Sequence, residues 1–266
     1  MTQDFTAWVG RSVTATDTIT TRDARRMAQT LDCTVPDGIL PPLWHWMGWA
    51  PEAMHADLAS DGHLQRGGFL PPVPLERRMW AGGKLTFQGH LRIDETLTRQ
   101  SEITKVSAKT GASGEMVFVT VAHHTAGTHG HVDETQDIVF VAIPDHYAPP
   151  PPQPAPPAPD WTHRFNADPV RLFRFSALTF NGHRIHYDLP YATATEHYPG
   201  LVVHGPLQAM VLMGAAMQHA GKAPTSYSFR GVRPAFAGPL TLQSWGKKLA
   251  SVDADGMQCM TAEVAF

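Results

Sequence analysis

The part of the chain best equipped for chemistry is a histidine-rich stretch in its second half, residues 174–207. It holds four of the fifteen histidines and shows little amphipathic periodicity between Asn181 and Pro190. A polar loop bracketed by apolar segments is a candidate site, because loops carried on a rigid scaffold often host function. Imidazole titrates near neutral pH and can act as base and acid in the two directions, so a histidine of this stretch could carry a proton transfer.

The start of the next helix could stabilise developing negative charge. Residues 205–221 read GPLQAMVLMGAAMQHAG, with Pro206 in the first turn and Gly221 at the expected stop. This segment is apolar almost all round, which predicts a mostly buried helix. A helix N-terminus is electropositive and its amides are unpaired, and Pro206 has no N–H. The backbone N–H of Gly205 is therefore the expected oxyanion donor.

The elements that must position these residues are mainly strands. Alternating hydrophobicity predicts antiparallel strands at 97–106, 115–123 and 135–142, and again at 226–232, 240–251 and 257–266. A second helix is predicted over 21–31, with Thr20 or Thr21 as its N-cap. Few helices and many strands indicate an α+β protein.

The strands fall into two similar halves. Three pairs of residues share one offset of 142 positions, namely Phe87 and Phe229, Gly89 and Gly231, and Gly114 and Gly256. Residues 148–160 read APPPPQPAPPAPD, which favours an extended polyproline spacer because proline cannot donate to a ladder. We therefore predict a first repeat at 1–147, a linker at 148–160 and a catalytic repeat at 161–266. Each repeat would be a curved antiparallel sheet wrapped around a central helix.

Two motifs in the second half resemble those of the MaoC-like dehydratases, the R-specific enoyl-CoA hydratase family. That family carries Asp-x-Asn-Pro-x-His on a loop and Val-His-Gly at the start of its central hotdog helix. Here residues 181–186 read NGHRIH and residues 203–205 read VHG. Three further segments resemble the sequences of one subgroup of this family. They are FSALTFNGHRIHYD at 175–188 and, in the first half, GFLPP and RRMWAGG. This subgroup contains the type 2 hydroxyacyl-thioester dehydratases and the related mesaconyl- or itaconyl-CoA hydratases.

The resemblance implies a double hotdog fold and water addition across an α,β-unsaturated thioester. The family's aspartate is Asn181 here, and its Asn-Pro pair is replaced by His183 and Arg184. An amide can orient a water but cannot take its proton, so His186 would carry the proton transfer alone. Residues 20–27, taken as the counterpart in the first half, contain no histidine. We therefore expect one active site per chain.

The resemblance also implies the substrate, a 2-enoyl-CoA with a short branched or dicarboxylic acyl group. Examples are mesaconyl-C4-CoA and itaconyl-CoA, hydrated to citramalyl-CoA. A free carboxylate needs a cationic anchor, for which Arg78 and Arg184 are candidates, and the CoA phosphates need arginines near the groove. A structural role is equally open for His183, His204 and half of the arginines. The expected substrate-binding residues are His183, Arg184, His204, Arg77, Arg78, Arg230 and Arg233.

Other functions remain open at this point. One is dehydration of a 3-hydroxyacyl thioester in fatty-acid metabolism, and another is hotdog thioesterase chemistry, although those enzymes usually place an acidic residue where Asn181 stands. A third is a non-catalytic acyl-binding subunit. A metal site built on His183, His186, His197 and His204 lacks the glutamate of a helical zinc motif. We expect no metal and no cofactor, since CoA is part of the substrate.

Bulk properties narrow the partners. The formal charge of −3 offers no basic stripe for nucleic acid, and the longest apolar stretch is too short to span a membrane. Two widely separated cysteines fit a reducing compartment, and residues 1–10 lack the pattern of a secretory signal. We expect a cytoplasmic protein. Two fused hotdogs already form the usual dimer unit, so a monomer and a homodimer of chains are both open.

Overall fold

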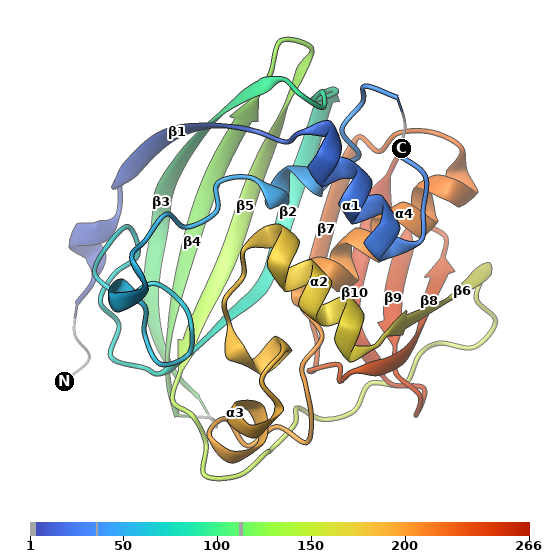
Figure 1. Cartoon of the computed structure of the whole chain (residues 1–266). Helices are drawn as coiled ribbons and strands as arrows, with labels where there is room; N and C mark the ends of the chain where they lie inside the picture. The colour runs from blue at the N-terminus through green and yellow to red at the C-terminus, as the bar shows by residue number, and fades with distance from the viewer. Residues whose placement is uncertain (1–3, 36, 112–113) are drawn as a thin grey trace.

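A single curved antiparallel sheet forms the body of the protein (Figure 1). The computed structural model describes residues 4–35, 37–111 and 114–266, and within these residues the strand order is β1-β3-β4-β5-β2-β7-β10-β9-β8-β6. The strands are β1 (Ser12–Thr18), β2 (Arg77–Gly89), β3 (Thr96–Gly111), β4 (Gly114–Ala126), β5 (Gly130–Val141), β6 (Trp161–Ala167), β7 (Ser226–Gly231), β8 (Gly238–Trp245), β9 (Lys248–Val252) and β10 (Gln258–Ala265).

The sheet consists of two halves with the same strand order. Read from each outer edge to the centre, β1-β3-β4-β5-β2 and β6-β8-β9-β10-β7 are equivalent. The halves join where β2 pairs antiparallel with β7, Gly82 to Thr86 opposite Arg230 to Ser226. A bulge at Ala81 in β2 shifts which residues face inward on either side of it. The predicted repeat is therefore present in the topology.

Two sequence-level details of the repeat are wrong. The predicted strand at 240–251 is two strands, because Gly246 takes a positive φ of 63° and closes the hairpin between β8 and β9. Gly114 and Gly256 are not equivalent positions either. Gly114 begins β4, whereas Gly256 lies in the turn that joins β9 to β10, so their shared offset is a coincidence.

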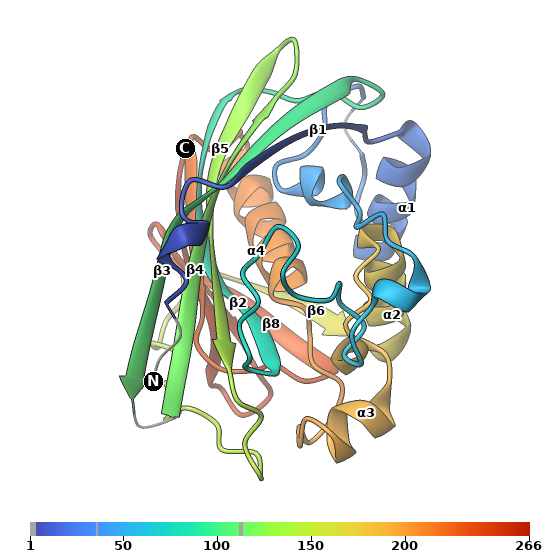
Figure 2. The same ribbon diagram turned by 90° about the vertical axis from the view of Figure 1, so that its left-hand side faces the viewer.

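Helices cover the concave side of the sheet, and α4 is the one that packs deepest. They are α1 (Thr21–Leu31), α2 (Pro169–Thr179), α3 (Leu189–Ala194) and α4 (Gly205–Ala220), with single 3₁₀ turns η1 (Thr6–Trp8), η2 (Trp44–Met47), η3 (His55–Asp57) and η4 (Arg184–His186). Figures 1 and 2 show α4 between the sheet of the second half and the outer pair α1 and α2. Nine of its residues are buried, from Leu207 to Ala216, as its apolar pattern predicts.

The helices α1 and α2 are the equivalent pair, since each follows the first strand of its half. A capping box between Thr20 and Asp23 fixes the start of α1, which has the predicted bounds. Residues 20–27 were expected to be the counterpart of the 181–186 loop. This expectation is wrong, because residues 20–27 belong to the start of α1 and therefore correspond to α2. The segment after α1, from Asp32 on, holds the position of that loop.

The proline-rich segment 148–160 runs between β5 and β6 with one isolated bridge, from Pro154 to Met257. The domain bounds drawn at its ends stay a prediction. Cys33 is exposed and Cys259 is buried, and both are free thiols. Within the residues that the structure describes, no helix is both long and apolar enough to cross a membrane.

Candidate active site

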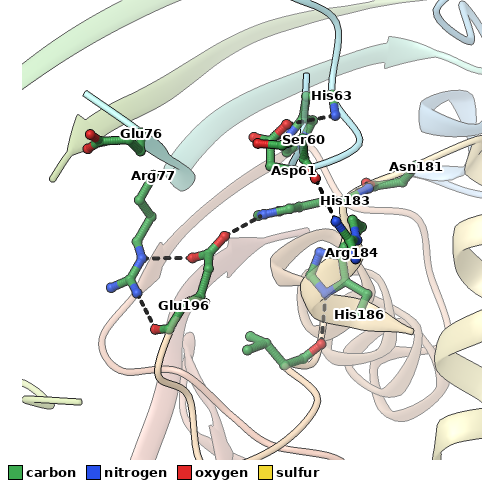
Figure 3. Close-up of polar contacts among 12 residues, drawn as sticks. Ser60, Asp61, His63, Glu76, Arg77, Asn181, His183, Arg184, His186 and Glu196 are labelled. Atoms are coloured by element: carbon green, nitrogen blue, oxygen red, sulfur yellow. Dashed lines mark hydrogen bonds and ion pairs between the residues drawn. The ribbon is translucent and has the colours of Figure 1, made fainter. Parts of the chain in front are cut away.

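His186 is the last residue of η4, in the loop that follows α2 (Figure 3). Its Nδ1 lies 2.7 Å from the carbonyl oxygen of Val202, and the amide of Val202 in turn donates to Ile185 O at 2.9 Å. A carbonyl oxygen can only accept, so the Nδ1 of His186 carries the proton and its Nε2 keeps a lone pair. The structure thus leaves Nε2 free to accept a proton.

The environment of His186 keeps it neutral. The side chain is 7% exposed, and burial lowers its pKa well below the ordinary value, with His204 and His183 lowering it further. The His204 ring stacks on it with centroids 3.7 Å apart. Ser176 Oγ binds His204 Nε2 at 2.8 Å, and burial lowers the pKa of His204 to about 3. His204 therefore acts as a neutral platform for the His186 ring.

A buried ion pair supports His183, the other histidine of the loop. Its Nε2 lies 3.2 Å from Glu196 Oε1, while Arg77 donates to Glu196 Oε2 at 2.9 Å and to the Glu196 carbonyl at 2.6 Å. Figure 3 shows this line of contacts from Arg77 through Glu196 to His183. The Arg77 guanidinium also lies 4.5 Å from the Tyr198 ring centroid. Arg77 is thus a buried partner of Glu196. The expectation that it would be a free cation near the groove is wrong.

A loop of the first half, residues 60–63, completes the site and was missed by the sequence reasoning. The Asp61 carbonyl accepts from Arg184 N at 3.0 Å, and the Asp61 carboxylate binds His63 Nδ1 at 3.0 Å. The His63 ring lies 4.3 Å from that of His183. Gly62 packs directly on Gly182, where a Cβ would stand 1.9 Å from the Gly182 oxygen. The only signal for this contact is two glycines far apart in the sequence.

Asn181 occupies a different position from the one expected of a water ligand. Its Oδ1 accepts the backbone N–H of His183 at 3.0 Å, and its own N–H donates to Ser176 O at 2.8 Å. This is the side-chain turn that asparagine commonly makes with the residue two positions ahead. The amide oxygen of Asn181 is therefore used to shape the loop, which leaves only its NH₂ group for a water.

The N-terminus of α4 lies against the strand that joins the two halves. A Cβ at Gly205 would stand 3.8 Å from the carbonyl oxygen of Trp80 in β2. Among the described residues, the backbone N–H of Gly205 has no hydrogen-bond partner. Such an amide at a helix start is a ready donor for an anion. The structure thus places a free donor beside the β2 residues that precede the bulge.

The remaining predicted arginines differ in how they are held. Arg184 donates to Asp188 at 2.9 Å and to the Ser60 carbonyl at 3.0 Å, and it covers the Tyr191 ring. Arg230 is exposed on β7, and Arg233 lies 4.0 Å from Asp253. A role for Arg230 or Arg233 with the CoA phosphates stays a prediction. The side chain of Arg78, a residue of the β2–β5 ladder, makes no hydrogen bond or ion pair with any described residue.

Asp61, His63 and His183 also have the composition of a cation site, with ligand atoms within 4.8 Å of one another. Their hydrogen bonds to each other and to Glu196 account for these short distances. Burial lowers the pKa of His63 to about 3, and the positive charge of Arg78 contributes to this lowering. A neighbouring cation disfavours a metal ion and favours an anion. We therefore keep the prediction that this site works without a metal.

The family model described as hydroxyacyl-thioester dehydratase type 2 matches residues 43–237. Mesaconyl-C4-CoA hydratase of Chloroflexus aurantiacus is 44% identical over 242 residues, 88% of this chain and 85% of that protein. A MaoC-like dehydratase of Phytophthora capsici superposes with a TM-score of 0.71 at 14% identity, over 97% of this chain and 95% of that one.

The predicted fold class is confirmed by a further solved structure. A Mycobacterium tuberculosis protein described as having a double hotdog fold superposes with a TM-score of 0.56 at 14% identity, covering 96% of this chain and 95% of its own. An α+β double hotdog is therefore the architecture of this chain, in agreement with the repeated strand order.

Proposed function

Because this chain belongs to the type 2 hydroxyacyl-thioester dehydratase family, we propose that it adds water reversibly across the double bond of a 2-enoyl-CoA, with His186 as its base. The observation that carries this proposal is the contact between His186 Nδ1 and Val202 O, which leaves Nε2 unprotonated. A neutral, oriented imidazole is what abstraction of a proton from water requires.

The mechanism uses one histidine in both steps. The Nε2 of His186 takes a proton from water while the oxygen of that water bonds to the β-carbon. The electrons of the double bond move toward the thioester oxygen, which becomes enolate-like and is stabilised by the N–H of Gly205 at the start of α4. His186 then returns the proton to the α-carbon, so that atoms and charge balance. Dehydration follows the same path backwards.

The substrate we propose is a short enoyl-CoA with a second carboxylate, of the kind named in the mesaconyl-C4-CoA hydratase relative. Hydration of mesaconyl-C4-CoA would place the hydroxyl on the carbon that carries the carboxylate and the methyl group. The identity of 44% over most of both chains supports this choice over a fatty-acid dehydratase, since the type 2 dehydratase of fission yeast mitochondria is 26% identical.

Replacing the base tests the proposal. The variant His186→Ala should lower kcat by roughly 10²- to 10⁴-fold, the usual contribution of a general base. Loss of the conjugated enoyl-thioester absorbance measures hydration, and a thiol reagent measures any hydrolysis. The matched control is His163→Ala, an exposed histidine of β6 that should leave kcat unchanged.

The outcomes separate the alternatives. Thiol release by the parent protein would point to a thioesterase, and inactivity on every enoyl-CoA tried would favour an acyl-binding subunit. Undiminished activity of His186→Ala would remove the mechanism. Cytoplasmic location and a homodimer of chains stay predictions, which fractionation of cells and the solution mass would test.

A further inference from the structure

Arg78 stands out as a partly buried cation whose side chain has no hydrogen-bond or ion-pair partner among the described residues. Two residues beyond it along β2, before the bulge at Ala81, is Trp80, whose carbonyl lies beside Gly205. Arg78 is paired with Phe140, which is fully buried, and directly opposite residues of an antiparallel pair share a face. The Arg78 side chain therefore belongs to the inner face, about 7 Å along the strand from Trp80.

The charges around Arg78 do not balance. Burial lowers the pKa of Arg78 to about 10, with the Asp61 charge opposing and the Arg66 charge adding to this effect. The pKa stays far above neutral pH, so the guanidinium remains charged. Asp61 uses its carboxylate on His63, and Arg66 donates to the carbonyls of Val73 and Glu76. The Arg78 charge thus acts with a second cation, Arg66, and with a single carboxylate that already binds His63, which leaves an excess of positive charge at Arg78.

The other arginines near the loop are committed elsewhere. Arg77 is held by Glu196, and Arg184 by Asp188 and the Ser60 carbonyl. A partly buried cation without a counter-ion is costly, and proteins retain such a group where an anion binds. The planar fork of an arginine fits a carboxylate with two parallel hydrogen bonds.

We propose that Arg78 is the specificity-determining residue of this site and binds a carboxylate carried on the β-carbon of the enoyl-CoA. This inference rests on the proposed function and restricts its substrate class. A thioester carbonyl on Gly205 puts the β-carbon between that donor and Arg78, close to His186. Binding of the carboxylate by Arg78 then sets which carbon meets the water on His186.

A pair of substrates that differ only at the carboxylate tests the proposal. Mesaconyl-C4-CoA and 3-methylcrotonyl-CoA share a skeleton, with a methyl group in the second where the first has its carboxylate. We expect kcat/KM of the parent protein to favour mesaconyl-C4-CoA by roughly 10²-fold or more. The variant Arg78→Met should lose this preference because its kcat/KM for mesaconyl-C4-CoA falls, mainly through a higher KM. Its kcat/KM for 3-methylcrotonyl-CoA should stay that of the parent. Arg22→Met, at an exposed position of α1, is the matched control.

A binding measurement without turnover covers the case in which the variant is inactive. Succinyl-CoA carries a carboxylate on its β-carbon, and butyryl-CoA has a methyl group there. Arg78→Met should weaken succinyl-CoA binding by roughly 10²-fold and leave butyryl-CoA binding within about threefold. The melting temperature of Arg78→Met should equal or exceed that of the parent, because a partly buried cation without a partner is removed.

The outcomes distinguish this inference from the proposed function. Equal loss on both substrates, or equal weakening of both ligands, would overturn the role of Arg78. A parent protein that hydrates 3-methylcrotonyl-CoA as well as mesaconyl-C4-CoA would also overturn it, while the hydratase function would stand. Hydration of neither substrate, with succinyl-CoA still bound through Arg78, would refute the hydratase function and keep the carboxylate site.

Discussion

At the scale of single residues, the site is defined by which ring nitrogen is free. The Val202 carbonyl fixes the proton of His186 on Nδ1, and Ser176 orients His204 beneath it. The sequence could indicate His186, because its motif has a recognisable spacing. It could not indicate Asp61, His63 or Glu196, since none of them lies in a motif and tertiary packing alone brings them to His183.

The Asn181 side chain holds the backbone of its own loop. Since its Oδ1 accepts the His183 N–H, Asn181→Ala should destabilise the loop by about 1 kcal/mol and lower kcat. Asn181→Asp preserves the acceptor, so its melting temperature should stay close to that of the parent. Thermal unfolding and initial rates measure both effects. Equal melting temperatures for the parent and Asn181→Ala would show that this hydrogen bond does not shape the loop.

At the scale of elements, the two loops of the site meet at a pair of glycines. Gly62 has a φ of +89°, and a Cβ there would collide with the Gly182 oxygen. Gly62→Ala should therefore separate the 60–63 loop from the 181–186 loop, lowering both the melting temperature and kcat. Gly68→Ala is the control, because a Cβ at Gly68 has nothing within 4 Å. Similar activity of the two variants would mean that this contact does not hold the site together.

The start of α4 can be tested by removing one N–H. Gly205→Ala keeps the donor, and its Cβ would have no contact closer than 3.8 Å. Gly205→Pro removes the donor at the first helical position, where proline is tolerated best. We expect kcat of Gly205→Pro to fall by roughly 10²- to 10³-fold below that of Gly205→Ala, the usual cost of one oxyanion donor. Equal kcat values, with both variants folded by circular dichroism, would exclude this donor.

Regular elements were the easiest part of the fold to predict. The helix α1 has the predicted bounds, and α4 begins at the predicted Gly205, because caps and apolar periodicity are local signals. The β8–β9 hairpin looks like one strand in the sequence, since Gly246 alone marks a turn of two residues between Trp245 and Lys248. The equivalence of α1 with α2 follows from strand order in space, which no local pattern carries.

At the scale of the whole molecule, the first half has a buried polar cluster of its own and also contacts the site in the second half. The interior of the first half has a buried carboxylate of its own, Glu134, which Trp46 binds at 3.0 Å and Gln136 at 2.8 Å. His45 lies 3.2 Å from the same carboxylate. Arg77 of β2 and Asp61 of the 60–63 loop also contact the second half, so the loop that carries His186 is held by residues of both halves.

The buried histidines make the stability of the whole protein depend on acid. Burial lowers the pKa of His204 and of His63 to about 3 in the folded protein, against about 6.5 in an unfolded chain. Between these values the unfolded chain binds more protons, so the free energy of unfolding rises with pH. The stability that depends on these two histidines being neutral is fully present above pH 6.5, and it is lost as the pH falls toward 3.

The expected slope is roughly 1 kcal/mol per pH unit for each of these histidines, measured by urea unfolding between pH 4 and pH 7. His204→Gln removes one of the two titrations and should therefore give a shallower slope, whatever its stability at neutral pH. His163→Gln, at an exposed position of β6, should keep the slope of the parent. A His204→Gln slope equal to that of the parent would mean that His204 is protonated alike in the folded and unfolded chains. The His186 ring would then stack on an imidazole that titrates near neutral pH, and His204 would not be the permanently neutral platform that its burial implies.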